Sequence, residues 1–136
     1  MTEQHRAVVR VRDVMKLHVD MVDGLTSVAD ALRQMKHVET KTLIVDKRHE
    51  DDEYGIVLIS DIAREVLAKN RSPERVSVYE IMTKPVISVH PDMDIRYCAR
   101  LFERFALSRT PVIDEGQIVG IVSHTDMVLR GLYRDL

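Results

Sequence analysis

The sequence has no tryptophan, and aromatic residues of all kinds make up only 4% of its 136 residues. A hydrophobic core must therefore be built from valine, isoleucine, leucine, methionine and alanine. Apolar residues reach 45% and charged residues 31%, proportions that are normal for a globular protein. The length suits one ordinary domain or two small halves that share a core.

The sequence also has no large excess of charge of one sign, because it contains 20 lysines and arginines and 22 aspartates and glutamates, for a net charge of -2. The sequence thus lacks the basic footprint of a nucleic-acid-binding protein. No apolar run approaches the roughly 18–20 residues of a membrane helix, and Met1 to Arg12 lack the apolar segment of a signal peptide. Cys98 is the one cysteine, which excludes an internal disulfide and fits a reducing compartment. We expect a cytoplasmic protein that contacts neither nucleic acid nor membrane.

Motifs of catalysis are equally scarce. There is no Gly-x-Ser-x-Gly elbow and no glycine-rich phosphate loop. The six histidines lack metal-binding spacing, and the acidic stretch His49–Glu53 is explained more simply by a solvated hairpin loop than by a cation site. Cys98 lies on an apolar helical stripe, which predicts burial without activation. We therefore expect no catalytic residues, no required cofactor and no metal.

What the sequence does contain is an internal repeat. An apolar-x-acidic-apolar-Met string occurs at Val11–Met15 and again at Val78–Met82. Each string precedes a β-branched stretch, at 19–22 or 86–89, then a turn and a predicted helix. Apolar residues recur along each helix at i, i+3, i+4 and i+7. These stripes are Val28, Ala31, Leu32 and Met35 in the first copy, and Ile95, Cys98, Ala99 and Phe102 in the second.

The second half of each copy predicts a β-hairpin followed by a closing helix. Strands at 43–46 and 111–114 lead through a turn into the matching segments Gly55–Asp61 and Gly120–Asp126. Closing helices are predicted at 62–68 and 127–132. Each copy is then strand, helix, strand, strand, helix, and a unit of this size buries too little surface to be secure alone. We place repeat 1 at 8–70, a linker at 71–75 and repeat 2 at 76–136.

Ser123 and Asp126 stand where a predicted strand enters a helix. A helix start offers free backbone N–H groups to an anion, and a serine hydroxyl can donate to the same oxygens. An aspartate carboxylate can accept hydrogen bonds from two neighbouring ribose hydroxyls. The pair therefore suits a nucleoside phosphate. The spacing alone supports equally well a purely structural role in which both residues cap the helix.

The ordered set of motifs resembles the CBS domain family, whose members usually occur as tandem pairs. The second copy matches the family pattern at Met82, Pro85-Val86, Val89-His90-Pro91, Ser108–Asp114 and Gly120–Asp126. The first copy departs from it, because Thr40–Ile44 contains no proline and Leu58 replaces a threonine or serine. The resemblance implies an α+β fold in which two β-α-β-β-α repeats pack sheet to sheet with pseudo-twofold symmetry.

The resemblance also implies two ligand clefts, each combining the aspartate of one repeat with the first strand and Ser-Arg-x-Pro segment of the other. The first cleft would contain Asp61 for the ribose, Val86 and Ile87 against the base, Ser108 and Arg109 near phosphates, and Pro111 in the wall. The second would contain Ser123, His124 and Asp126 with Val19, Asp20, Thr40 and Lys41. Each is complete on one side only, so one occupied site is as well supported as two, with a slight preference for the first. Arg109 and Lys41 could equally be ordinary surface charges.

The function implied by the resemblance is a regulatory module that senses AMP, ADP, ATP or S-adenosylmethionine and signals in trans to an unknown effector protein. The alternative is a structural or dimerisation module without a ligand, which the departures of the first copy favour. The predicted closing helices carry more apolar surface than a monomer needs, so we expect a homodimer. The residues concerned are Ile62, Ala63, Val66 and Leu67, and Met127, Val128, Leu129 and Leu132.

Overall fold

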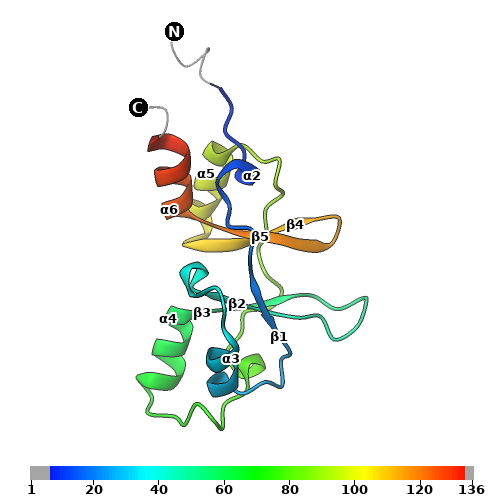
Figure 1. Ribbon diagram of the computed structural model, residues 1–136, viewed down its shortest axis with the longest axis vertical. Helices are drawn as coiled ribbons and strands as arrows, with labels where there is room; N and C mark the ends of the chain where they lie inside the picture. The colour runs from blue at the N-terminus through cyan, green and yellow to red at the C-terminus, as the bar shows by residue number, and fades with distance from the viewer. Residues whose placement is uncertain (1–6, 134–136) are drawn as a thin grey trace. The chain divides into compact units, whose positions relative to one another are not determined.

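The protein divides into two compact units in a computed structural model that describes residues 7–133 (Figure 1). One unit is His18–Val86, and the other consists of the described residues of Met1–Leu17 and Ile87–Leu136. The mixture of helices and strands confirms the predicted α+β class. Residues 1–6 and 134–136 lie outside the described part, and they include the start of the stretch from Met1 to Arg12 and the end of the predicted second repeat.

The unit His18–Val86 is built on a three-stranded sheet of β1 (Asp20–Val22), β2 (Thr42–Val45) and β3 (Gly55–Leu58). Strand β2 lies in the centre, parallel to β1 and antiparallel to β3. The buried core joins the sheet to the helices around it through Val22, Val28, Ala31, Leu43, Val45, Val57, Val66, Val76 and Val78.

The helices of this unit are short. Helix α3 (Val28–Gln34) begins at Ser27, whose hydroxyl accepts a hydrogen bond from the Asp30 amide at 3.0 Å. Helix α4 (Ile59–Ile62) follows β3 directly and continues into a π-helical segment, η2 (Ala63–Leu67). Single 3-10 turns form η1 (Val38–Thr40) and η3 (Val78–Glu80).

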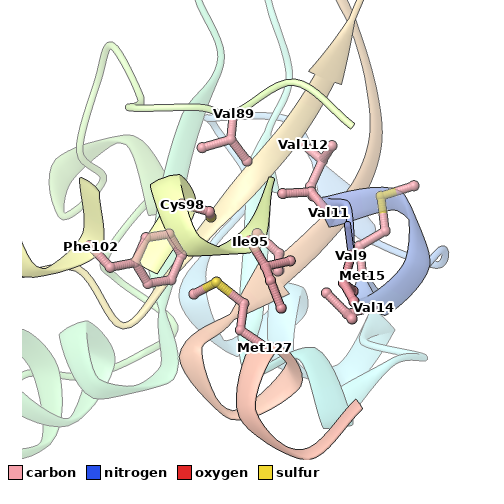
Figure 2. Close-up of a cluster of buried hydrophobic side chains, with 11 residues drawn as sticks. Val9, Val11, Val14, Met15, Val89, Ile95, Cys98, Phe102, Val112 and Met127 are labelled. Atoms are coloured by element: carbon pink, nitrogen blue, oxygen red, sulfur yellow. The ribbon is translucent and has the colours of Figure 1, made fainter. Parts of the chain in front are cut away.

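The other unit is built on a hairpin of β4 (Arg109–Asp114) and β5 (Gln117–Ser123). In Figure 1, α2 (Val11–Val14), α5 (Ile95–Phe105) and α6 (His124–Asp126) gather on one side of this hairpin, and α6 continues as η4 (Met127–Leu132). Figure 2 shows the apolar cluster that they enclose, which contains Val9, Val11, Val14, Met15, Val89, Ile95, Cys98, Phe102, Val112, Val122 and Met127.

Cys98 is fully buried in this cluster, and the removal of its thiol from water raises the pKa to about 11. A thiol with this pKa stays protonated at neutral pH and is a poor nucleophile. The prediction that Cys98 is buried without activation is therefore confirmed.

The leading string of each repeat packs against the hairpin of the other repeat. Lys16, which follows the first string, exchanges two backbone hydrogen bonds with Ile121 of β5, at 2.8 and 2.9 Å. Thr83, which follows the second string, exchanges two with Ile56 of β3, at 3.0 and 2.9 Å. Each compact unit is thus completed by a segment of the other sequence copy. The limits 8–70 and 76–136 remain a prediction about the sequence repeats, since the units record which segments pack together.

The strand expected at 86–89 is reduced to one isolated parallel bridge, between Val89 and Val112. The Val89 amide donates to the Pro111 carbonyl at 3.2 Å, and the Ile113 amide donates to the Val89 carbonyl at 2.9 Å. The next bond of a parallel ladder would need an N–H group on Pro111, which proline lacks. The Thr110 hydroxyl donates to the Ile87 carbonyl in its place. Proline at 111 therefore explains why this strand is shorter than predicted.

Three smaller expectations were also wrong. Leu32 was placed on a buried stripe but is 40% exposed, and Ala29 is buried instead. Ala99 is exposed on α5. The closing helices begin at 59 and 124 rather than at 62 and 127, because Asp61 and Asp126 cap their first turns. Within residues 7–133, none of the helices has the length and apolar character needed to cross a bilayer.

Candidate functional site

Two aspartates occupy equivalent positions, each as the third residue of the helix that follows a hairpin. The Oδ2 atom of Asp61 accepts a hydrogen bond from the Leu58 amide at 2.8 Å. The Oδ2 atom of Asp126 accepts one from the Ser123 amide at 3.0 Å. Both carboxylates therefore stabilise the start of their helices, and in each case Oδ1 is the oxygen left for another partner.

The surroundings of Asp126 are buried, and its carboxylate accepts several hydrogen bonds. The Ser123 hydroxyl donates to Oδ2 at 2.9 Å and accepts from the Asp126 amide at 3.1 Å. The Lys16 ammonium forms an ion pair with Oδ1. The side chain of Asp126 is 3% exposed and that of Lys16 is 28% exposed. Burial of a carboxylate lowers the free energy of unfolding unless an opposite charge compensates it, and Lys16 provides that charge.

The surroundings of Asp61 are more open. Its Oδ1 accepts from Nη2 of Arg64 at 2.7 Å, three residues further along the same helix. The side chain of Arg64 is 63% exposed, and Leu58 contributes no hydroxyl group. The two copies therefore hold the same carboxylate with different cations.

The Ser-Arg-x-Pro segment lies beside Asp126 in the same compact unit. Arg109 is paired in register with Ser123, and the His124 amide donates to the Ser108 carbonyl at 3.1 Å. Ile87 is joined to this segment through the buried Thr110 hydroxyl, and Pro111 is buried behind it. This unit brings together seven of the predicted site residues, namely Ile87, Ser108, Arg109, Pro111, Ser123, His124 and Asp126.

The remaining predicted residues belong to the other unit, which contains Val19, Asp20, Thr40, Lys41, Asp61 and Val86. Asp20 accepts hydrogen bonds from the Lys36 and His37 amides at 2.9 and 2.8 Å. Its carboxylate therefore stabilises the loop after α3, and its charge is compensated by these two backbone amides. The buried Thr40 hydroxyl donates to the His37 carbonyl at 2.9 Å, whereas Lys41 is exposed.

A pocket of about 540 Å³ lies within this second unit between β1 and the end of α3. Its lining mixes apolar and polar side chains, namely Val19, Asp20, Met21, Val22, Ala31, Gln34, Met35, Lys36 and His37. Of the residues predicted for the second cleft, Val19 and Asp20 line this pocket, and Thr40 and Lys41 lie outside its lining. Both clefts predicted from the sequence combine residues of the two units, and they remain predictions.

Sequence reasoning missed the two cations. Arg64 could have been found, because it lies at i+3 from Asp61 on a predicted helix. Lys16 lies 110 residues from Asp126 in the chain, and only the packing of the leading string onto β5 reveals it.

The acidic hairpin loop is exposed at His49, Glu50, Asp51 and Glu53, as predicted, and Asp52 is the exception. The Lys84 ammonium lies 2.8 Å from Oδ1 of Asp52, and this hydrogen bond holds the pKa of the Asp52 carboxyl well below its usual range. The side chain of Asp52 is only 10% exposed, so the solvated loop that we predicted does not include this carboxylate. In the part of the chain that the structure describes, no three metal-ligating side chains gather into a site.

The comparison with protein families gives two matches to the CBS domain, at residues 11–68 and 78–132. Among solved structures, the hexameric CBS-CP12 protein from bloom-forming cyanobacteria shares 38% identity, with a TM-score of 0.88. The match covers 94% of this chain and 74% of that one. A CBS domain pair solved in complex with 5′-methylthioadenosine and S-adenosyl-L-methionine shares 25% identity, with a TM-score of 0.76. That match covers 95% of this chain and 98% of the other.

Some relatives of similar sequence are much longer proteins. An uncharacterized protein of Methanopyrus kandleri is 29% identical over 104 residues, which are 76% of this chain and 52% of that protein. Homoserine O-acetyltransferase of Methanosalsum zhilinae is 34% identical over 122 residues, which are 88% of this chain and 23% of the enzyme. The chain spans about half the length of the first curated relatives that it matches.

Proposed function

Because this chain belongs to the CBS domain family, we propose that it is a regulatory module that binds an adenine nucleotide or a related adenosyl compound. The observation that carries the proposal is the Ser123–Asp126 pair at the start of α6, with Ser108 and Arg109 beside it. The neighbour that binds 5′-methylthioadenosine and S-adenosyl-L-methionine supports this ligand class, since it matches nearly the whole chain. The role is regulatory rather than catalytic, and its location is the cytoplasm.

The residues assign separate tasks to the parts of such a ligand. The Asp126 carboxylate accepts hydrogen bonds from the ribose hydroxyls. Arg109 and Ile87, which we grouped with Asp61 from the sequence, serve the ligand of Asp126 in this proposal. Arg109 offers a planar guanidinium that can bond two phosphate oxygens together, and Ile87, which is 39% exposed, offers an apolar face to the base. A ligand can change the protein only by binding one arrangement more tightly than another. An effector protein in trans reads that change.

Ligand binding should be visible as thermal stabilisation. At a concentration of about 100 times its dissociation constant, a ligand raises the free energy of unfolding by roughly 2.7 kcal/mol. We expect this from at least one of ATP, ADP, AMP and S-adenosylmethionine, measured by differential scanning calorimetry. Asp61→Asn and Asp126→Asn, studied separately, should show which aspartate is used, because the neutral amide accepts fewer hydrogen bonds from ribose.

The second candidate function is a structural or interaction module without a ligand. Leu58, which lacks the hydroxyl of Ser123, and the absence of a proline in Thr40–Ile44 favour it. If none of the four compounds raises the transition temperature of the wild-type protein, the nucleotide proposal is wrong and this second function is preferred.

We further propose that the chain forms a homodimer through its closing helices. Val128, Leu129 and Leu132 are 48%, 59% and 47% exposed on η4, and Leu67 on η2 is 77% exposed. Apolar side chains grouped in this way on a short helix favour burial against another protein surface. The hexameric neighbour supports self-association in this family.

Leu129→Lys should weaken this association about tenfold or more, because a charge placed in an apolar contact loses its hydration. Multi-angle light scattering over a range of concentrations measures the effect. Leu25→Lys is the matched control, since Leu25 is 78% exposed and lies on the other unit. A wild-type protein that stays monomeric, or equal weakening by both variants, would contradict an interface at η4.

A further inference from the structure

Lys16 is fixed beside Asp126 by its backbone. Its amide and carbonyl both bond to Ile121 of β5, at 2.8 and 2.9 Å. The approach is so close that a Cβ atom on Gly120 would lie 2.5 Å from the Lys16 carbonyl oxygen. The root of the lysine side chain therefore cannot move away while the unit stays folded, and only its flexible stem can redirect the ammonium.

The ammonium occupies the oxygen that a nucleoside would need. Oδ2 of Asp126 already accepts from the Ser123 amide and hydroxyl, at 3.0 and 2.9 Å. Oδ1 accepts from Lys16. A carboxylate has about four acceptor sites, and these three bonds leave one of them open. Two neighbouring ribose hydroxyls that both bind this carboxylate must therefore displace the ammonium from Oδ1.

The displaced ammonium then needs another anion. Lys16 is only 28% exposed, so water alone compensates its charge poorly. In an adenosine 5′-phosphate, the ribose whose hydroxyls bind the Asp126 carboxylate also carries a phosphate, which is an anion for the ammonium. Adenosine brings no charge, and the sulfonium of S-adenosylmethionine brings a positive one close to the ribose. With an adenosine 5′-phosphate, the Asp126 carboxylate and the Lys16 ammonium therefore both gain a new partner. With adenosine or S-adenosylmethionine, the ammonium gains none.

We propose that Lys16 is the specificity-determining residue that selects adenosine 5′-phosphates over uncharged or cationic adenosyl compounds at Asp126. The inference rests on the proposed function, because it assumes that Asp126 binds ribose. It does not extend to the other copy. Thr83 stands there in the place of Lys16, and the cation on Asp61 is Arg64, which is 63% exposed and stays hydrated when it is displaced.

The test compares AMP with adenosine, two ligands that differ only in the phosphate, by isothermal titration calorimetry on the full chain. The wild-type protein should bind AMP more tightly. Lys16→Met should lower the affinity for AMP by about 10- to 100-fold, the effect of losing one charged hydrogen bond. It should leave the affinity for adenosine unchanged or raise it, because Oδ1 is then unoccupied.

Further variants separate selection from stability. Lys16→Gln keeps a hydrogen-bond donor for Oδ1 without the charge. This variant should lose the preference for AMP over adenosine, and it remains informative even if Lys16→Met folds poorly. Lys16→Arg should keep the preference for AMP. Lys84→Met is the matched control, since Lys84 is likewise a partly buried lysine, paired with Asp52. It should leave the ratio of the two affinities unchanged.

The outcomes are distinct. If AMP and adenosine both bind and the ratio of their affinities is the same in the wild-type protein and in Lys16→Gln, the selection by Lys16 is refuted while the proposed function stands. If the wild-type protein binds none of ATP, ADP, AMP, adenosine and S-adenosylmethionine, the proposed function fails and the inference fails with it.

Discussion

Gly120→Ala is expected to lower the free energy of unfolding by about 2–4 kcal/mol. The new Cβ atom would meet the Lys16 carbonyl oxygen at 2.5 Å and the Met15 sulfur at 3.0 Å. A backbone oxygen cannot rotate away as the end of a side chain can, so the leading segment must separate from β5. The two backbone hydrogen bonds between Lys16 and Ile121 then lengthen or break. Chemical denaturation followed by circular dichroism suits this measurement, since the chain has no tryptophan.

Gly24→Ala is the control for this substitution. A Cβ atom there would contact Tyr79 at 3.4 Å and Val45 at 3.5 Å, which are ordinary van der Waals distances. We expect a change of less than about 1 kcal/mol. Equal effects at positions 24 and 120 would show that the leading segment tolerates separation from β5, and the account of Lys16 would lose its structural basis.

Leu43→Ala should destabilise the other unit by about 2–5 kcal/mol, the range for removing a buried leucine side chain. Leu43 has no exposed surface and lies in the central strand β2, opposite Asp20 of β1 and Val57 of β3. Truncation leaves a cavity that the sheet cannot close without breaking its own hydrogen bonds. This loss is a large part of the roughly 5–15 kcal/mol by which a natural domain is stable.

Leu25→Ala makes the same chemical change at a side chain of the same unit that is 78% exposed. It should alter the free energy of unfolding by less than about 0.5 kcal/mol. The two leucines differ mainly in burial, so similar losses at both positions would contradict the placement of the core around β2.

The repeat and its order of elements could be predicted because both depend on local patterns. The i, i+3, i+4, i+7 stripe predicted α5, and a short apolar run that ends in an acid, Leu43–Asp46, predicted β2. The same reasoning failed where a distant residue decides the outcome. The strand at 86–89 is limited by Pro111, which supplies no N–H group to Ile87.

The candidate site shows the same division. Ser123 and Asp126 were identified from their spacing, and the structure joins them by hydrogen bonds in both directions. Lys16 was not identified, because a lysine after a methionine has no distinctive local pattern. Its role follows from the pairing of its backbone with Ile121, which no feature of residues 11–16 encodes alone.

Because the leading strings pack on each other's repeats, the two units can fold only at different times during synthesis. Residues 18–86 are contiguous, so every contact of their unit exists once residue 86 has left the ribosome. Lys16, in contrast, waits for Ile121, which is made about 100 residues later. At roughly 5–20 residues per second, that delay is about 5–20 s. During that delay the apolar side chains of Val11, Val14 and Met15, which are buried in the folded unit, have no hairpin to cover them and can contact other apolar surfaces.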